Sequence, residues 1–129
     1  MDCFLRICAG ESSFLEATNP SPEEIERAID ELIPVKYHFV VLEYDELIEN
    51  CAYVQTLITG DDTPDIRYQI ETRFIYENNF QHYQKFTTDV DEIKKVFRMF
   101  ALEVMPNIEG WTDITANFPV KDSKEKSNA

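Results

Sequence analysis

The chain has 129 residues, of which 43% are hydrophobic and 29% are charged, and its 25 Asp and Glu against 12 Lys and Arg give a net charge of −13. This length and composition predict a single globular domain and exclude a disordered chain. The charge disfavours binding to nucleic acid or to anionic membranes and favours a basic protein partner, although an acidic surface also serves solubility alone.

Three further features concern location. No apolar run approaches the roughly 20 residues that a membrane span needs. Residues 1–6 lack the basic and apolar regions of a signal peptide. Cys3, Cys8 and Cys51 are an odd number of cysteines without metal-site spacing, as is typical of reduced thiols. We therefore expect a cytoplasmic protein.

The first part of the chain predicts a β-hairpin and then a helix. Two short apolar segments, 4–8 and 13–17, flank a turn that contains a glycine. A capping box begins a helix at Ser21, and Pro34 stops it. The apolar positions on one face of this helix are Ile25, Ala28, Ile29 and Leu32.

Four strand-like segments follow at 37–44, 52–58, 66–74 and 81–87, with a turn at 60–65. The third alternates regularly, which predicts one apolar and one polar face. Its apolar residues are Ile66, Tyr68, Ile70 and Phe74, and its polar residues are Arg67, Gln69, Glu71 and Arg73. The fourth is more polar, as expected of an edge strand.

A second amphipathic helix begins at Thr88 or Asp89 and ends before Pro106. Its apolar stripe consists of Ile93, Val96, Phe97, Phe100, Ala101 and Val104. Residues 107–113 form a closing loop that contains the only tryptophan. We expect one domain at 1–118 and a disordered polar tail at 119–129.

The order of elements is β-β-α-β-β-β-β-α. Strands joined by short turns are antiparallel, and two amphipathic helices need a sheet face to cover. The sequence therefore predicts an α+β fold with a mainly antiparallel sheet of about six strands and both helices on one face.

No motif indicates an enzyme, a metal site or a cofactor. No serine stands in a G-x-S-x-G motif, and no phosphate-binding motif occurs. His38 and His82 lack metal-ligand spacing. A spatial pair of Cys51 with His82 stays open, although Cys8 and Cys51 are better interpreted as small core residues. We expect a non-enzymatic protein with no metal and no cofactor.

One candidate surface is the polar face of the sheet, opposite the helices. If neighbouring strands pair in order, many polar residues at alternating positions share this face. They are Gln55, Arg67, Gln69, Glu71, Arg73, Gln84 and Lys85. Gln55, Glu71 and Arg73 are the main candidates for contact with a partner or ligand. The alternative is an ordinary solvated sheet face with cross-strand ion pairs.

A second candidate surface is acidic. Between Tyr37 and Ile66 there is no Lys or Arg. The acidic residues of this stretch are Glu43, Asp45, Glu46, Glu49, Asp61, Asp62 and Asp65. They fall in two connections at opposite ends of a shared strand, so a single patch is not assured. A concentrated negative surface would suit a basic protein partner.

Five segments carry a likeness to known proteins: 21–32, 39–43, 53–55, 70–73 and 110–113. In them the chain is similar to small uncharacterised bacterial proteins. In layout it resembles immunity proteins of polymorphic-toxin systems, with a hairpin, a helix, a sheet meander, a second helix and then a tryptophan. The resemblance implies a non-enzymatic protein that binds and neutralises a cognate toxin.

Three hypotheses therefore stand after the sequence alone. The first is an acidic binding protein, such as an immunity protein, that occludes a basic partner. The second is a homo-oligomeric structural or regulatory domain that pairs an edge strand or a sheet face. The third is an enzyme or small-ligand protein that uses the polar sheet face, with Gln55, Glu71, Arg73 and His82 lining a pocket.

Overall fold

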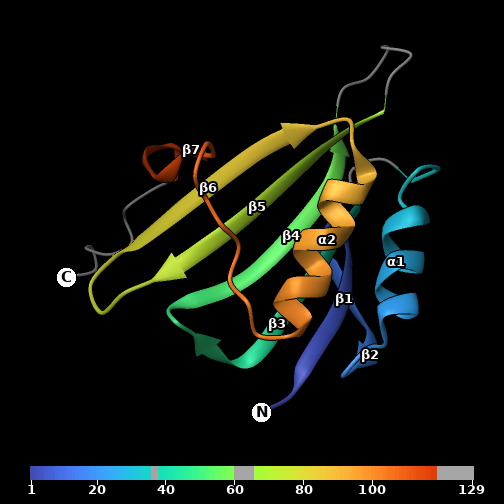
Figure 1. Ribbon diagram of the computed structural model, residues 1–129, viewed down its shortest axis with the longest axis horizontal. Coiled ribbons are helices and arrows are strands. Elements are labelled where there is room, and N and C mark those ends of the chain that lie inside the picture. Colours follow the sequence, from blue (N-terminus) through green and yellow to red (C-terminus); the bar gives the residue numbers. More distant parts are fainter. Residues whose placement is uncertain (36–37, 60–65, 119–129) are drawn as a thin grey trace.

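The computed structural model describes residues 1–35, 38–59 and 66–118. Seven strands form one antiparallel sheet in the order β2-β1-β3-β4-β5-β6-β7, and both helices lie on the same face of it (Figure 1). The predicted α+β fold is thus confirmed, with one strand more than expected. The elements are β1 (Cys3–Ala9), β2 (Ser12–Thr18), α1 (Pro22–Asp30), β3 (His38–Ile48), β4 (Cys51–Thr59), β5 (Arg67–Ile75), β6 (Phe80–Thr87), α2 (Val90–Ala101), β7 (Thr112–Asp113) and a 3-10 turn η1 (Thr115–Asn117).

Helix α1 begins as the sequence predicts. The Ser21 hydroxyl accepts a hydrogen bond from the backbone N–H of Glu24 at 3.1 Å, and the Glu24 carboxylate accepts one from the backbone N–H of Ser21 at 2.9 Å. This reciprocal pair satisfies two backbone donors that the first turn of a helix leaves unpaired. The helix ends at Asp30, one turn before Pro34.

Helix α2 ends earlier than Pro106 predicts. The N–H of Val104 donates to the carbonyl of Met99 and that of Glu103 to Phe100, both at 2.9 Å, and Glu103 has a φ of 65°. These two bonds form a Schellman motif, which closes the helix after Ala101. Val104 therefore lies outside the helix and is exposed, so its predicted place in the apolar stripe is wrong.

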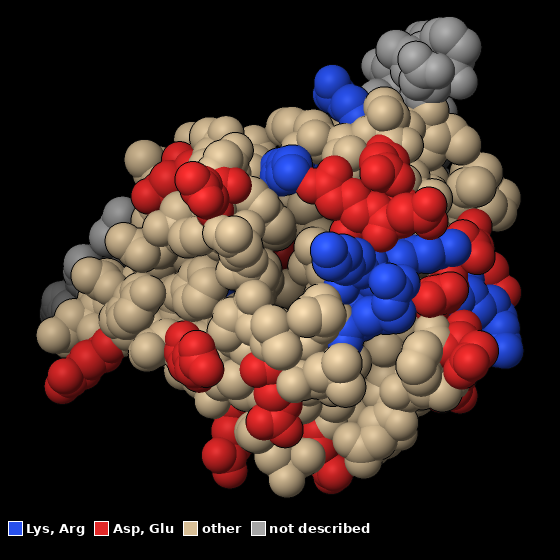
Figure 2. Space-filling model, in the orientation of Figure 1, with Lys and Arg blue, Asp and Glu red and all other residues tan. Residues whose placement is uncertain are grey.

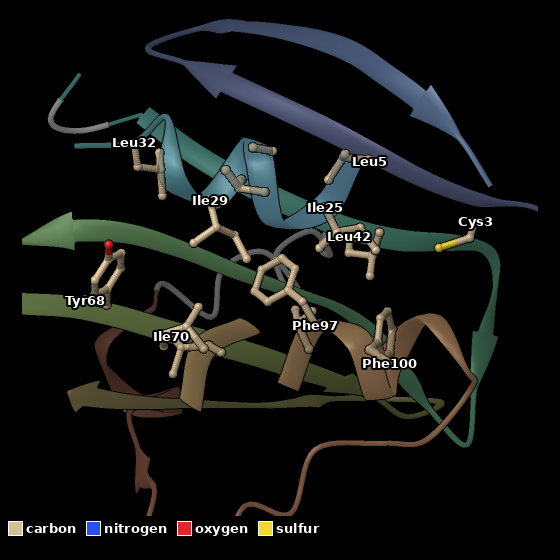
Figure 3. Packing of buried hydrophobic residues seen from close by; sticks show 14 of the residues in the cluster. Cys3, Leu5, Ile25, Ile29, Leu32, Leu42, Tyr68, Ile70, Phe97 and Phe100 are labelled. Carbon is tan, nitrogen blue, oxygen red and sulfur yellow. The ribbon is translucent and has the colours of Figure 1, made fainter. Parts of the chain in front are cut away.

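The core lies between the helices and the sheet (Figure 3). Leu5, Leu42 and Ile70 face Ile29 and Phe97, and all five side chains are buried. Burying one such side chain contributes roughly 1.5–3 kcal/mol, so the helices are held mainly by this layer.

Two details of the core concern its polar and sulfur-containing side chains. The Tyr44 hydroxyl donates to the carbonyl of Phe100 at 2.7 Å, which ties the end of α2 to β3. Cys3 and Cys51 are buried in the core, whereas Cys8 lies on the opposite sheet face and is only half-buried. The interpretation of Cys8 as a core residue is therefore wrong.

Strand β3 is longer than predicted. It continues through Asp45–Ile48, where a loop was expected, and joins β4 by a two-residue turn of Glu49 and Asn50. Both turn residues have a positive φ, 50° and 73°, as type I′ hairpin turns require. At the other margin β6 is not the edge strand that its polarity predicts, because β7 pairs with Tyr83 and Gln84.

Candidate functional site

The sheet face opposite the helices carries a polar network built from three strands. Register places Gln55, Glu71 and Gln84 in one row across β4, β5 and β6, and Tyr53, Arg73 and His82 in the next. Side chains opposite one another on antiparallel strands lie about 4.5–5.5 Å apart at Cβ, close enough for direct contact. The predicted clustering of Gln55, Glu71 and Arg73 on one face is what the register produces.

Glu71 is the centre of this network. Its carboxylate oxygen Oε1 accepts from His82 Nε2 at 2.6 Å and from Gln55 Nε2 at 3.2 Å, and its Oε2 accepts from Gln69. The residue is only 7% exposed. Burial raises the pKa of Glu71, but the hydrogen bonds from His82, Gln69 and Gln55 outweigh burial and lower the pKa below its ordinary value. Glu71 is therefore a carboxylate at neutral pH.

The tautomer of His82 follows from its two partners. Arg73 Nε donates to His82 Nδ1 at 3.0 Å, so this ring nitrogen carries no hydrogen. Nε2 then bears the hydrogen and donates it to Glu71. The ring is 1% exposed and packs against the ring of Phe118, with centroids 4.5 Å apart. Both nitrogens of His82 are thus occupied within the protein.

Aromatic rings hold the Arg73 guanidinium from two sides. Its central carbon lies 4.1 Å from the ring centroid of Phe80 and 4.7 Å from that of Phe118. Cation–π contacts of this kind attract a guanidinium that lies over an aromatic face. Burial raises the pKa of Tyr53, and the nearby charge of Arg73 opposes the rise without cancelling it, so the Tyr53 hydroxyl stays protonated.

Glu71 and His82 resemble the carboxylate–histidine pair of acid–base catalysis. In this structure, however, both nitrogens of His82 already have partners within the protein. A general base needs a ring nitrogen within reach of the proton it abstracts. Here Arg73 and Glu71 take both nitrogens of His82, and Phe118 covers the ring. Gln55 donates directly to Glu71, and Arg73 is linked to Glu71 through His82, so the hydrogen bonds of this cluster run between its own side chains.

Two contacts of this surface are not predicted from the sequence, and one residue is predicted on the wrong face. Phe118 covers His82 and Arg73 from a segment far along the chain, and no local pattern indicates that contact. Arg6 of β1 forms an ion pair with Glu43 of β3 at 2.7 Å, a pairing that the sequence does not predict. Lys85 was expected on this face, but the register turns it toward α2, where it pairs with Glu92.

The predicted acidic residues do not all gather in one place. Glu43 lies on the polar sheet face, paired with Arg6. Asp45 is exposed and accepts the backbone N–H of Asp2 at 3.1 Å. The remaining described members, Glu46 and Glu49, are exposed near the β3–β4 turn. Asp61, Asp62 and Asp65 lie outside the described residues. The predicted turn at 60–65 and the tail at 119–129 also lie outside them.

The helix face carries charges of both signs. In Figure 2 the Lys and Arg side chains gather over α2 and toward α1, with Asp and Glu around them. Lys94 pairs with Asp30 at 2.8 Å, and Arg98 pairs with Glu26 at 3.3 Å. Two of the three cations of α2 are thus matched by carboxylates of α1.

Within residues 1–35, 38–59 and 66–118, no three or more His, Cys, Asp or Glu side chains come together as a metal site would need. In the same part of the chain, no helix is long and apolar enough to span a membrane. Cys51 lies on the helix side of the sheet, where its thiol contacts Thr72 at 3.3 Å, and it therefore does not pair with His82.

Comparison of the chain with protein-family models, with curated proteins and with solved structures found no match. The geometry and charge of the chain itself are therefore the basis for assigning a function.

Proposed function

We propose that this protein is a non-enzymatic binding protein that recognises a basic protein partner and occludes its working surface. The observation that carries the proposal is the uncompensated negative charge. The chain has 25 acidic against 12 basic residues, and among the described residues the exposed carboxylates of Glu46 and Glu49 have no ion-pair partner. A surface of this kind steers a basic partner into contact and speeds its association.

Two further observations support this function. The Glu71–His82–Arg73 cluster is occupied internally, so it serves to shape a rigid surface. The layout also resembles that of immunity proteins, which neutralise a toxin by binding to it. Both observations fit a cytoplasmic protein that acts by covering a target.

A homo-oligomeric domain is the second candidate function. The observation that favours it is the exposure of two large apolar side chains on the terminal strand β2, Phe14 at 55% and Leu15 at 51%. Strand β2 has an outer edge that no described strand pairs with. Such edges are templates for pairing between chains.

The test is capture from the lysate of the native host on immobilised protein, washed at low and then at high salt. Poly-glutamate on the same matrix is the control, since it carries negative charge without the fold. We expect one basic protein that binds the chain, is absent from the control, elutes with salt and loses its own activity when the chain is added back. Recovery of the same chain alone, with a mass that rises with concentration, would instead establish the oligomeric domain.

A further inference from the structure

The two margins of the sheet differ in how they are closed. At the β6 margin, β7 pairs with Tyr83 and Gln84, and the N–H of Ile114 donates to the carbonyl of His82 at 2.8 Å. At the β2 margin the sheet order ends, and six of the seven β2 residues are exposed. Alternate residues of an edge strand turn their N–H and C=O groups outward. Strand β2 contains neither Lys nor Pro, which often protect such edges.

A groove of about 370 Å³ runs beside this open edge, between the β1–β2 hairpin and α1. Its apolar walls come from Ile7 and Phe14 of the hairpin and from Leu32 and Val35 after α1. Phe14 belongs to both features, because it lies on the edge strand and lines the groove. An extended segment added to β2 would therefore place every second side chain toward this groove.

The rim of the groove is acidic because of how α1 distributes its carboxylates. Glu26 and Asp30 lie on the flank toward α2, where Arg98 and Lys94 neutralise them. Glu24 and Glu31 lie on the other flank and line the groove together with Glu16 of β2. The other ionisable groups in the lining are Arg27 and His38. The groove thus combines apolar walls with an excess of negative charge.

We propose that the β2 edge and this groove receive an extended basic segment of the partner protein, which adds to the sheet as an eighth strand. Its backbone pairs with β2, an apolar side chain enters the groove beside Phe14, and flanking Lys or Arg side chains meet Glu16 and Glu31. A second copy of this chain fits less well, because it would bring another acidic rim and a net charge of −13 to the same place. This inference rests on the proposed function and adds the docking site.

The test uses the full chain, labelled with ¹⁵N, and a fluorescent peptide of seven residues, the length of β2. Lysine and valine alternate at its odd positions, and threonine occupies its even positions. The matched probe has the same side chains and charge but carries N-methyl groups on alternate backbone nitrogens. We expect the first peptide to shift the amide signals of β2, and the N-methylated peptide to bind at least about tenfold more weakly, because several backbone hydrogen bonds are lost.

A pair of charge variants tests the rim of the groove. Glu31→Gln should weaken peptide binding about two- to fivefold, which is the effect of one exposed ion pair. Glu26→Gln is the control, since Glu26 lies on the opposite flank of α1 and pairs with Arg98. Its binding should equal that of the unaltered protein.

Three results would overturn the docking site. They are equal binding of the N-methylated peptide, amide shifts confined to elements other than β2 and α1, and self-association through β2 that the peptide does not displace. If one of these results appears while a basic partner is still captured from lysate with salt-sensitive binding, the docking site is wrong and the proposed function stands. If no basic partner is captured, the proposed function itself fails.

Discussion

Replacing Glu71 with glutamine removes a negative charge from the centre of the polar network while keeping the shape of the side chain. The carboxylate accepts hydrogen bonds from His82, Gln55 and Gln69. Glutamine has only one acceptor oxygen, and its NH₂ group must face at least one of these donors. A hydrogen bond to a charged group contributes about 1.5–3 kcal/mol, and a buried donor left unpaired costs about 1–3 kcal/mol. We expect Glu71→Gln to lower the free energy of unfolding by about 2–3 kcal/mol at pH 7.

The stability lost in Glu71→Gln should be larger at neutral pH than at acidic pH. The pKa of Glu71 is lower in the folded protein than its ordinary value of 4.5. The stabilisation is therefore complete above the unfolded-state pKa, and it is lost as pH falls through the lowered, folded-state pKa. Urea unfolding of both proteins between pH 7 and pH 3, followed by Trp111 fluorescence, measures the difference. It should be constant above about pH 5 and shrink below pH 4.5.

Glu46→Gln is the matched control, because it neutralises an exposed carboxylate of β3. Its effect should stay within about 0.5 kcal/mol. A loss for Glu71→Gln that is no larger than this control, or one that is the same at pH 3 as at pH 7, would refute the assignment of Glu71 as the charged centre of the network.

Three further predictions concern the core, the end of α2 and the thiols. Phe97→Ala should lower the free energy of unfolding by about 3–5 kcal/mol in urea titration, because this side chain of α2 is fully buried in the core between the helices and the sheet; a loss under about 1 kcal/mol would contradict that packing. Glu103→Gly should raise it by about 0.5–1 kcal/mol, since Glu103 has a left-handed φ of 65°; Glu103→Ala, which keeps the Cβ atom, should not. In a thiol-reagent assay Cys8 should react first, because Cys3 and Cys51 are buried and burial raises the pKa of both, that of Cys3 to about 11; equal rates for the three thiols would count against that burial.

Periodicity is enough to place most of the fold, because a buried face imposes its period on the sequence. In β5, Tyr68 and Ile70 face the helices while Glu71 and Arg73 face away, as strict alternation predicts. The polar sheet face follows from the same alternation once neighbouring strands pair in order. The capping box likewise places the start of α1, because its geometry is local.

Each incorrect or missing prediction has a physical cause. In β6 the apolar Phe86 lies on the polar sheet face, opposite Gln69, and Lys85 lies on the helix face, so polarity does not indicate which side of this strand turns toward the helices. Val104 continues the apolar spacing of α2, yet the left-handed conformation of Glu103 ends the helix first. Strand β7 has two residues, too few for any pattern. Phe118 contacts His82 only through the tertiary fold, and no local sequence pattern predicts that its ring packs over the polar network.

The acidic residues beside β2 limit which extended chains can pair with this open edge. An open edge that presents Phe14 and Leu15 is a liability, because any extended chain can pair with its backbone. Glu16 sits at a bulge in that strand and, with Glu31, repels acidic segments, including a second copy of this chain. Charge at the rim of an interface acts mainly on association, whereas backbone pairing and the buried side chain govern dissociation. Raising salt should therefore slow the association of a basic segment more than it speeds its release, so the acids select the partner and the edge retains it.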